Sequence, residues 1–367
     1  MNTISFGFRT AVLSACCLLL WTLIGCKKER FNGQEGQNFK YTESQMMPGV
    51  VLGSVYFTSK FNAFTDLAYF QGRWMVVFRE GTKHLGGMPG RIKLLTSSDG
   101  KNWMVEQTFA LDSIDLRDPK IMIDSINNSV YITFFGANLK YQPAARVSNY
   151  YVEYMHNGRN DSISEIVEEW PNKDNYYLWR WTFESSENYC VGYRISRYDD
   201  TTTNLILLAG NHRFGDRKII NRLNLRGQPT ESTIRFEDDK RMVMIVRSDE
   251  GAFYIGNAVK PYTKFAWLPN KDFTRLASPN FLIYKSYLLI TGRDLKDNKF
   301  RFFAYNQVSG KIEKEITFKG GYEVGYGGMS FNPANKSEMW VSYYSIENGG
   351  SGSNIYLAKI NLPEVLK

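Results

Sequence analysis

The chain has 367 residues, enough for one or two domains, and a formal net charge of +8 at pH 7. Lys and Arg are scattered along it rather than clustered. The sequence also lacks a nucleic-acid motif, a phosphate loop and a dinucleotide fingerprint, which argues against nucleic-acid and nucleotide binding. Tyr, Phe and Trp make up 15% of the residues, well above their share in an ordinary soluble chain.

The N-terminus has the pattern of a bacterial lipoprotein signal. Arg9 is followed by an apolar run that ends in Leu23-Ile24-Gly25-Cys26. Such a run closes on a lipobox, and the chain is expected to be cut after residue 25 and lipidated on Cys26. The alternative is an uncleaved membrane anchor, but the run is short for a spanning helix and a small residue precedes Cys26.

This signal divides the chain into a signal peptide (1–25), a lipidated tether (26–48) and one domain (49–367). The tether is mostly polar and ends at the turn signal Pro48-Gly49. We expect an anchored, monomeric protein in the bacterial cell envelope. Lys27-Lys28 after the lipidated cysteine favour export to the outer membrane, on its periplasmic or its outer side. Cys190 is then the remaining free thiol and is expected to be buried.

After the tether, short alternating or aromatic-rich runs separated by turn signals predict strands. They group into units of an inner strand, a polar or glycine turn and an apolar second strand: 65–69 with 74–78, 120–123 with 130–134, 179–183 with 189–193, 232–236 with 242–247, 280–283 with 287–293, and 328–331 with 339–344. Further strands are predicted at 91–96, 204–208, 251–257, 301–305 and 354–360.

Six units at roughly fifty-residue spacing predict an all-β fold, a six-bladed β-propeller. Residues 50–58 are expected to complete the last blade and close the ring, which removes free sheet edges. Residues 145–176 are predicted to be an insertion in the second blade. Five blades with a long insertion are the alternative.

A set of charged residues and one tyrosine lies near the start of each unit, where propellers place their functional loops. A charge beside an apolar strand is costly unless it is paired or hydrated, so each residue of the set is either a blade-to-blade ion pair or part of a site. The set is Asp66, Arg79, Glu80, His84, Arg117, Asp118, Arg180, Glu231, Arg247, Arg293 and Tyr326. Convergent carboxylates of this kind suit glycoside hydrolysis, in which one is the acid and another the base or nucleophile.

The heptapeptide Ser97-Ser98-Asp99-Gly100-Lys101-Asn102-Trp103 resembles the Asp-box of sialidases, shortened by one residue. In that motif the Asp bonds turn amides and the Trp packs between strands, so Asp99 and Trp103 are expected to be structural. The chain from 60 to 362 is similar to sialidase-like bacterial propeller lipoproteins, also in Leu116–Lys120, Leu178–Arg180, Glu231–Phe236 and Trp340–Ser345.

The resemblance implies roles for individual residues. Sialidases hold the substrate carboxylate with three arginines, protonate the leaving group with an Asp and attack with a Tyr that a Glu activates. Glu231 and Arg247, 16 residues apart (247 − 231), match the Glu and the second arginine, Arg293 the third, and Tyr326 the nucleophile.

The first arginine and the acid Asp depart from the family pattern. Where the first arginine belongs, the chain reads Asn62-Ala63-Phe64-Thr65-Asp66, and Arg79 is expected to replace it. His84 or Asp118 is expected to replace the acid. Arg117 and Arg180 are further candidates for substrate binding.

Asp66, Arg117-Asp118-Pro119 and Glu231 also resemble the catalytic trio of invertase- and arabinanase-like propellers. That resemblance implies Asp66 as nucleophile or base, Asp118 as the residue that orients it and Glu231 as acid.

The sequence therefore predicts an exo-acting hydrolase of a terminal, perhaps acidic, sugar of an extracellular glycan. No cofactor and no metal is expected, since His156 and His212 lack metal-site spacing. A non-catalytic glycan-binding lipoprotein, and a polysaccharide lyase using His84 and Tyr326, are the alternatives. Among the aromatic residues near the third unit, Trp181 is expected in the core, and Trp179 either there or in the site.

Overall fold

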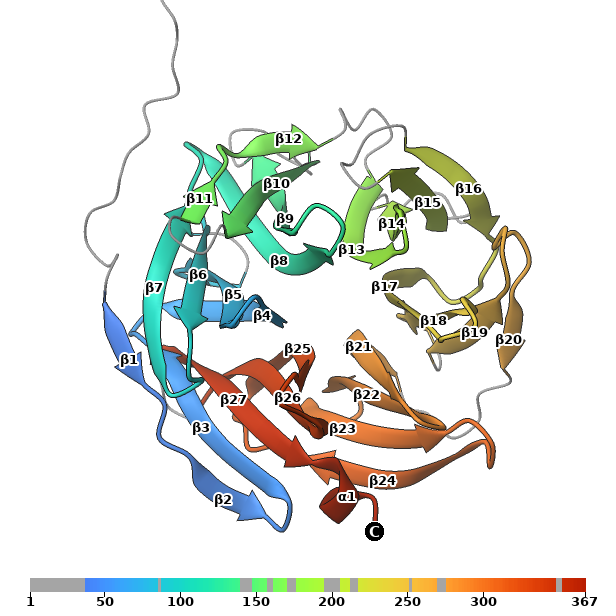
Figure 1. The fold of residues 1–367 in the computed structure, drawn as a ribbon. Coiled ribbons are helices and arrows are strands. Elements are labelled where there is room, and N and C mark those ends of the chain that lie inside the picture. The colour runs from blue at the N-terminus through green and yellow to red at the C-terminus, as the bar shows by residue number, and fades with distance from the viewer. Residues whose placement is uncertain are drawn as a thin grey trace, which may run out of the picture. The chain divides into compact units, whose positions relative to one another are not determined.

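A computed structural model describes residues 37–84, 87–138, 147–156, 161–169, 176–194, 205–211, 217–250, 253–268, 275–347 and 352–367. The predicted signal peptide, Cys26 and His212 lie outside these ranges. Within them, six antiparallel sheets are arranged in a ring (Figure 1), which confirms the six-bladed propeller and excludes the five-bladed count. The inner strands of a propeller line its central channel. The sheets belong to one compact unit, residues 34–367.

The strands of each blade follow one another from the channel outwards. Blade 1 contains β4 (Phe61–Phe70), β5 (Arg73–Gly81), β6 (Arg91–Ser97), β7 (Asn102–Phe109) and β1 (Asn38–Lys40). Blade 2 contains β8 (Ile114–Asp124), β9 (Ser129–Asn138), β10 (Val147–His156), and β11 (Asp161–Ile163) and β12 (Val167–Glu169). Blade 3 contains β13 (Tyr176–Glu184), β14 (Glu187–Arg194), β15 (Leu205–Asn211) and β16 (Lys218–Leu223).

Blades 4 to 6 complete the ring. Blade 4 contains β17 (Pro229–Phe236), β18 (Met242–Ser248), β19 (Tyr254–Ala258) and β20 (Ala266–Leu268). Blade 5 contains β21 (Leu276–Tyr284), β22 (Tyr287–Asp294), β23 (Lys299–Asn306) and β24 (Lys311–Thr317). Blade 6 contains β25 (Glu323–Asn332), β26 (Asn335–Ile346), β27 (Ser353–Asn361), β3 (Val50–Phe57) and β2 (Ser44–Met47).

The ring closes through the N-terminal strand β3. It pairs with β27 from Val50↔Ile360 to Phe57↔Asn354, as predicted for residues 50–58. An edge that would otherwise stay open is thereby paired. The short helix α1 (Leu362–Val365) packs its Leu362 and Val365 beneath this blade. No helix in the described ranges is long and apolar enough to cross a membrane.

Two sequence predictions need correction. Residues 38–47 were assigned to the tether, but β1 pairs with β7 and β2 with β3, so the propeller begins before residue 49. Residues 145–176 are not an insertion: β10 is the third strand of blade 2, and β11 and β12 both pair with it. β1, β2, β11 and β12 are short strands at the outer edges whose residues are mostly exposed or partly exposed, and β10 carries Ser, Asn, Glu and His among its apolar residues. None of them therefore has a clear apolar pattern.

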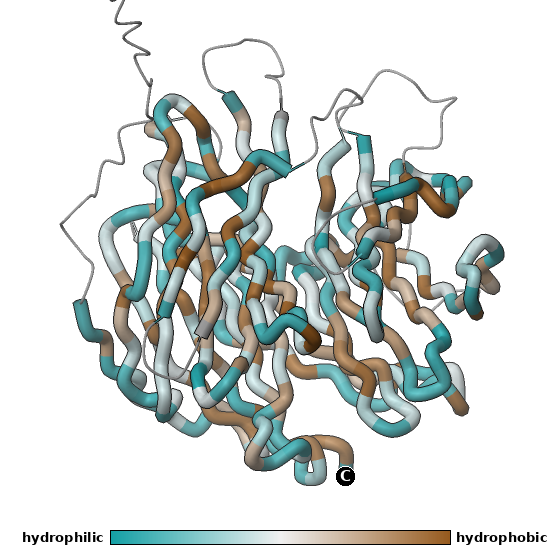
Figure 2. The backbone as a smooth tube through the Cα atoms, turned by 45° about the horizontal axis from the view of Figure 1, so that its top comes forward, coloured by the Kyte–Doolittle hydropathy of each residue, from teal (hydrophilic) through white to brown (hydrophobic). Residues whose placement is uncertain are grey.

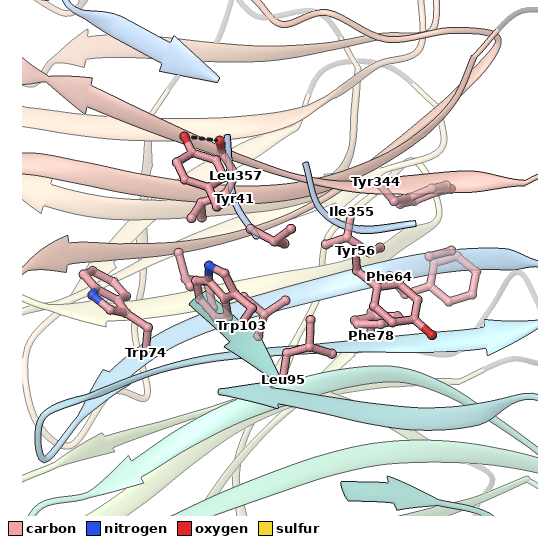
Figure 3. Close-up of a cluster of buried hydrophobic side chains, with 14 of the residues drawn as sticks. Tyr41, Tyr56, Phe64, Trp74, Phe78, Leu95, Trp103, Tyr344, Ile355 and Leu357 are labelled. Atoms are coloured by element: carbon pink, nitrogen blue, oxygen red, sulfur yellow. Dashed lines mark hydrogen bonds between the residues drawn. The ribbon is translucent and has the colours of Figure 1, made fainter. Parts of the chain in front are cut away.

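The core lies between neighbouring blades. Figure 3 shows the cluster at the junction of blades 6 and 1, where Trp103 is fully buried and the Tyr41 hydroxyl donates to the Leu357 carbonyl at 3.1 Å. Beside it Trp74 and Trp340 stack with ring centroids 3.7 Å apart. Apolar segments within the strands and polar turns, as coloured in Figure 2, follow from this burial. Each buried large side chain contributes about 1.5–3 kcal/mol.

The Asp-box turn is structural, as predicted. The Asp99 carboxylate accepts hydrogen bonds from the backbone amides of Lys101 and Asn102, both at 2.8 Å, and from Ser97 Oγ. The two amide bonds are the main reason that the pKa of Asp99 is lowered. Trp103 packs in the core described above, and Cys190 is buried, as predicted.

Candidate functional site

All six inner strands share one irregularity, at the same level of the channel. In each strand two consecutive residues face a single residue of the second strand, which is a β-bulge. The bulged pairs are Phe64-Thr65, Asp118-Pro119, Trp179-Arg180, Thr230-Glu231, Ser278-Pro279 and Tyr326-Gly327. Since a bulge re-aims side chains, these pairs form a ring around the end of the channel where the inner strands begin. We call this end the mouth.

The backbone is strained at four of these bulges. Phe64, Asp118, Ser278 and Tyr326 have φ angles of 63°, 51°, 48° and 54°. Such left-handed conformations cost about 1–3 kcal/mol for residues other than glycine and persist where neighbours fix them. Here neighbouring bulges bond each other: Tyr326 N donates to Ser278 Oγ at 3.2 Å, and Thr65 Oγ1 donates to the Tyr326 carbonyl at 2.7 Å.

Glu231 and Tyr326 meet at the mouth from blades 4 and 6. The Tyr326 hydroxyl donates to Glu231 Oε1 at 3.1 Å, while Glu231 Oε2 accepts from Arg247 Nη1 at 2.9 Å and from the Ser278 amide. Burial alone would raise the pKa of Glu231, but Arg247 and these hydrogen bonds outweigh it, so the net pKa is lowered. Glu231 is therefore a carboxylate at neutral pH.

Tyr326 is a neutral phenol at rest. Burial, followed by the charges of Glu231 and Asp118, raises its pKa well above the ordinary value. Its ring lies between aromatic neighbours, 4.7 Å from Phe64 and 6.1 Å from Trp179 between centroids. The phenol is thus fixed in place and keeps its proton until a base accepts it.

Three arginines surround this pair. Arg247 is held by Glu231 and, through Nε at 2.7 Å, by Asp249. Arg117 lies over the Phe64 ring at 5.2 Å and is 3.9 Å from Asp115 and from Asp118. Arg293 has a buried Nε with no hydrogen-bond partner in the part of the chain that the structure describes. Arg117 makes no hydrogen bond to the described residues beyond these long ion-pair contacts, so both guanidinium groups have donors that the described part of the chain does not use.

His84 reaches the mouth from the segment after β5. Its Nδ1 contacts Glu323 Oε1, which also accepts from the Tyr344 hydroxyl at 3.2 Å. Its ring is 5.1 Å from that of Phe64, the neighbour of Tyr326. Burial opposes ionisation of Glu323, but the bond from His84 leaves its pKa lowered overall. His84 is thus oriented by a carboxylate and is about one-third exposed.

Asp118 is occupied by an aromatic partner. Its Oδ2 accepts a hydrogen bond from the hydroxyl of Tyr177, which stacks on Phe135 at 3.8 Å. Its Oδ1 is buried without a hydrogen-bond partner among the described residues. Trp179, left open by the sequence, is 3% exposed and contacts both this aromatic group and Tyr326. Trp181 packs in the core between blades 2 and 3, as predicted.

Two of the predicted arginines lie outside the mouth. Arg79 is fully buried, and its Nε and Nη2 bond Asp115 Oδ1 at 2.9 and 2.7 Å. It therefore joins blades 1 and 2 and does not replace the missing first arginine. Arg180 points away from the mouth and bonds Asp66 at 2.7 Å.

Asp66 is likewise held by partners of its own. It is 1% exposed and accepts from Arg180 and the Ile121 amide. Asp66, Asp118 and Glu231 are thus each held by separate partners, unlike the convergent trio that the second resemblance implies.

Sequence reasoning missed Lys120, Glu323 and Ser278. Lys120 is buried in the channel, with Nζ 3.2 Å from the carbonyl oxygens of Asp118 and Pro119 and 4.5 Å from the Trp179 ring. Burial is the main reason that its pKa falls to about 8. A lysine opening an apolar run, directly after Asp118-Pro119, is a signal that could have identified it.

Comparison with known proteins identifies the fold. No family model and no curated protein matches the chain. A Dyadobacter fermentans protein of unknown function has a TM-score of 0.69 at 16% identity, over 86% of this chain and 100% of that one. Trypanosoma rangeli sialidase with the inhibitor DANA has 0.61 at 10%, over 84% and 56%, and phage phi92 endosialidase 0.61 at 11%, over 90% and 69%. The chain thus spans little more than half of the trypanosomal sialidase and has the propeller fold that these sialidase structures share.

Proposed function

We propose that this protein is a sialidase-like glycoside hydrolase that releases a terminal acidic sugar from an extracellular glycan. The observation that carries the proposal is the hydrogen bond from the Tyr326 hydroxyl to Glu231, in a mouth that also presents Arg117, Arg247 and Arg293. A neutral phenol beside a carboxylate base is a nucleophile that an anionic substrate does not repel.

The reaction follows from these positions. The Tyr326 oxygen attacks the anomeric carbon while its proton passes to Glu231, and the bond to the leaving oxygen breaks as that oxygen takes a proton from the acid. Water then attacks the anomeric carbon and gives a proton to the former acid, and Tyr326 leaves with the proton from Glu231. Two displacements retain the anomeric configuration.

The substrate carboxylate is expected between the arginines. Arg117 and Arg293 have free donors, and a guanidinium binds a carboxylate through two parallel hydrogen bonds. Arg117 thereby takes the place that the sequence assigned to Arg79. Arg247 chiefly fixes Glu231.

His84 is the proposed acid. Glu323 orients its ring, and the side chain is accessible at the rim of the mouth. Asp118, bonded to Tyr177, instead fixes the bulge of blade 2.

The test is turnover of an aryl sialoside by the wild type and by Glu231→Gln, with an aryl glucoside as the neutral control. We expect the variant to lose on the order of 10²–10⁴ in kcat. Undiminished turnover by Glu231→Gln would exclude the proposed base.

A second candidate, a glycan-binding protein without activity, is favoured by one observation: Arg79 is buried against Asp115 and does not fill the position of the first arginine in the family pattern. Saturable binding of an acidic oligosaccharide with no product after long incubation would establish it. An unsaturated product absorbing in the near ultraviolet would instead indicate a lyase.

We also propose that Cys26 carries lipid and anchors the protein to the bacterial cell envelope. There the protein would act on glycans outside the cytoplasm. Radiolabelled palmitate should be incorporated into the wild type and not into Cys26→Ala.

A further inference from the structure

A cavity of about 690 Å³ opens at the end of the channel away from the mouth. It is lined by the second halves of inner strands, including Ile121, Trp181, Leu282 and Met329, whereas the mouth is formed by their first halves. We call it the far pocket. The site described above does not use it.

Two arginines reach the far pocket from the channel. Arg180, 5% exposed, bonds Asp66, and its Nε is buried without a hydrogen-bond partner in the described ranges. Arg235 bonds only uncharged oxygens among the described residues: the Ile234 carbonyl at 2.8 Å, Asn280 Oδ1 at 3.0 Å and Thr182 Oγ1 at 3.4 Å.

The charges at this depth do not balance. Arg180, Arg235 and Lys120 carry three positive charges, and Asp66 is the carboxylate bonded to one of them. Asp118, whose partner Tyr177 is a neutral phenol, supplies a second negative charge that faces Lys120, and Glu231 is balanced by Arg247. Among the described residues one positive charge, that of Arg235, therefore has no carboxylate partner. Burial, followed by repulsion from Arg180, lowers the pKa of Arg235 to about 9. Arg235 is only partly buried, but a positive charge without a carboxylate partner among apolar walls is still costly and favours an added anion.

The side chains that line the far pocket indicate the chemistry of the rest of the ligand. Trp181, Phe183, Leu282, Met329 and Phe331 line the pocket with apolar surface, and Lys285 and Lys336 also line it. Such walls bury an apolar or planar group, while the arginines fix an anionic end.

We propose that the far pocket is a binding site for a small organic anion, whose carboxylate pairs with Arg180 and Arg235 and whose apolar body lies against Trp181, Phe183 and Phe331. The site is independent of the proposed hydrolysis, because no residue that lines the far pocket is among those proposed to bind or act on the sugar.

The test is isothermal titration calorimetry of the purified protein with 2-naphthoate and with 2-naphthalenemethanol, the same ring system without the charge. Naphthoate is expected to bind one site, and the alcohol at least about tenfold more weakly, the loss typical of a charged hydrogen bond. Equal affinities would overturn the proposal.

Variants locate the site. Arg235→Met is expected to weaken naphthoate binding about tenfold or more. Arg241→Met, on the exposed turn of the same blade, and Arg293→Met, at the mouth, should leave it unchanged. Loss in Arg293→Met with retention in Arg235→Met would place the anion at the mouth and contradict the proposal.

A second variant decides the matter if Arg235→Met does not fold. Ser330→Trp adds bulk to the pocket wall without removing a cation, and it should abolish naphthoate binding. Unchanged binding by a folded Ser330→Trp would exclude the far pocket.

Discussion

The Tyr326 hydroxyl lies 3.1 Å from Glu231 Oε1, although 95 residues separate the two in sequence. Each stands in the bulge of an inner strand, and blade 5 lies between their blades. The Ser278 bulge of that blade joins them, because its amide donates to Glu231 and its hydroxyl accepts from the Tyr326 amide.

If this pair acts as one unit, its variants are not additive. Tyr326→Phe and Glu231→Gln are each expected to lower kcat for an aryl sialoside by about 10²–10⁴, and the double variant by no more than the worse single one. Tyr287→Phe is the matched control, since Tyr287 bonds Glu313 at 2.6 Å far from the mouth. Fully multiplicative losses would argue against a dyad.

Arg293→Met should impair recognition of charge. We expect a rise in KM of about tenfold or more for an acidic sugar, because a charged hydrogen bond is lost, and little change for a neutral one. Steady-state kinetics on a matched pair of aryl glycosides measure this, with Arg241→Met as control. An equal rise for both substrates would mean that Arg293 supports the fold rather than the anion.

Arg247→Met should destabilise the fold by about 3 kcal/mol at neutral pH, because it leaves Glu231 buried without its cation. The lowered pKa of Glu231 means that its contribution is present above its unfolded value of 4.5 and is lost as pH falls through the folded value. In Arg247→Met, burial without the cation raises the pKa of Glu231 instead. The difference in unfolding free energy between wild type and variant should therefore narrow as pH falls, beginning above pH 4.5 and continuing below it. Urea unfolding across pH 3–8 tests this, and a constant gap would contradict it.

Lys120→Met should change the alkaline stability profile. The lysine has a pKa of about 8 in the fold against 10.5 when unfolded, so folding disfavours its charged form. The unfolded chain binds more protons between these values, and the wild type should gain on the order of 3 kcal/mol over the variant as pH rises through them. Urea titrations at pH 7.5 and 10.5 measure this difference, with Lys311→Met as the control. A difference independent of pH would show that Lys120 is hydrated in the fold.

Asp99→Ala should affect the fold and not the chemistry. Loss of its bonds to the turn amides is expected to lower the free energy of unfolding by about 1 kcal/mol. The exposed Asp238→Ala should change it by less than about 0.5 kcal/mol. Thermal unfolding and kcat, measured together, check both, and a large fall in kcat for Asp99→Ala would contradict a purely structural role.

The alternation of apolar and polar residues, together with the turn signals, sufficed to predict the six blades and the closing strand. This was possible because each inner hairpin has one strongly apolar strand. They did not predict β1, β2 and β10, whose pairing depends on neighbours that are distant in sequence or whose faces meet solvent. The pairing of Glu231 with Tyr326 came from family resemblance, since no local pattern encodes a contact across two blades.

The direction of each arginine was the least predictable feature. Arg79 and Arg247 both end a second strand, yet one is buried against Asp115 between blades and the other points to Glu231 at the mouth. Local sequence cannot separate the two outcomes, because they depend on which carboxylate the adjacent blade supplies.

The junction of blades 6 and 1 also determines how the domain would resist a force applied to its N-terminal end. The first contact to resist such a force is the pairing of β1 with β7, which has only three residue pairs. The second is the hydrogen bond from the Tyr41 hydroxyl to the Leu357 carbonyl in blade 6. Behind them stands the longer pairing of β3 with β27. A modest force would detach residues 38–41 from the sheet and lengthen the N-terminal tether by about 3.4 Å per residue. The force would act on the six-bladed ring only after these residues are detached and extended.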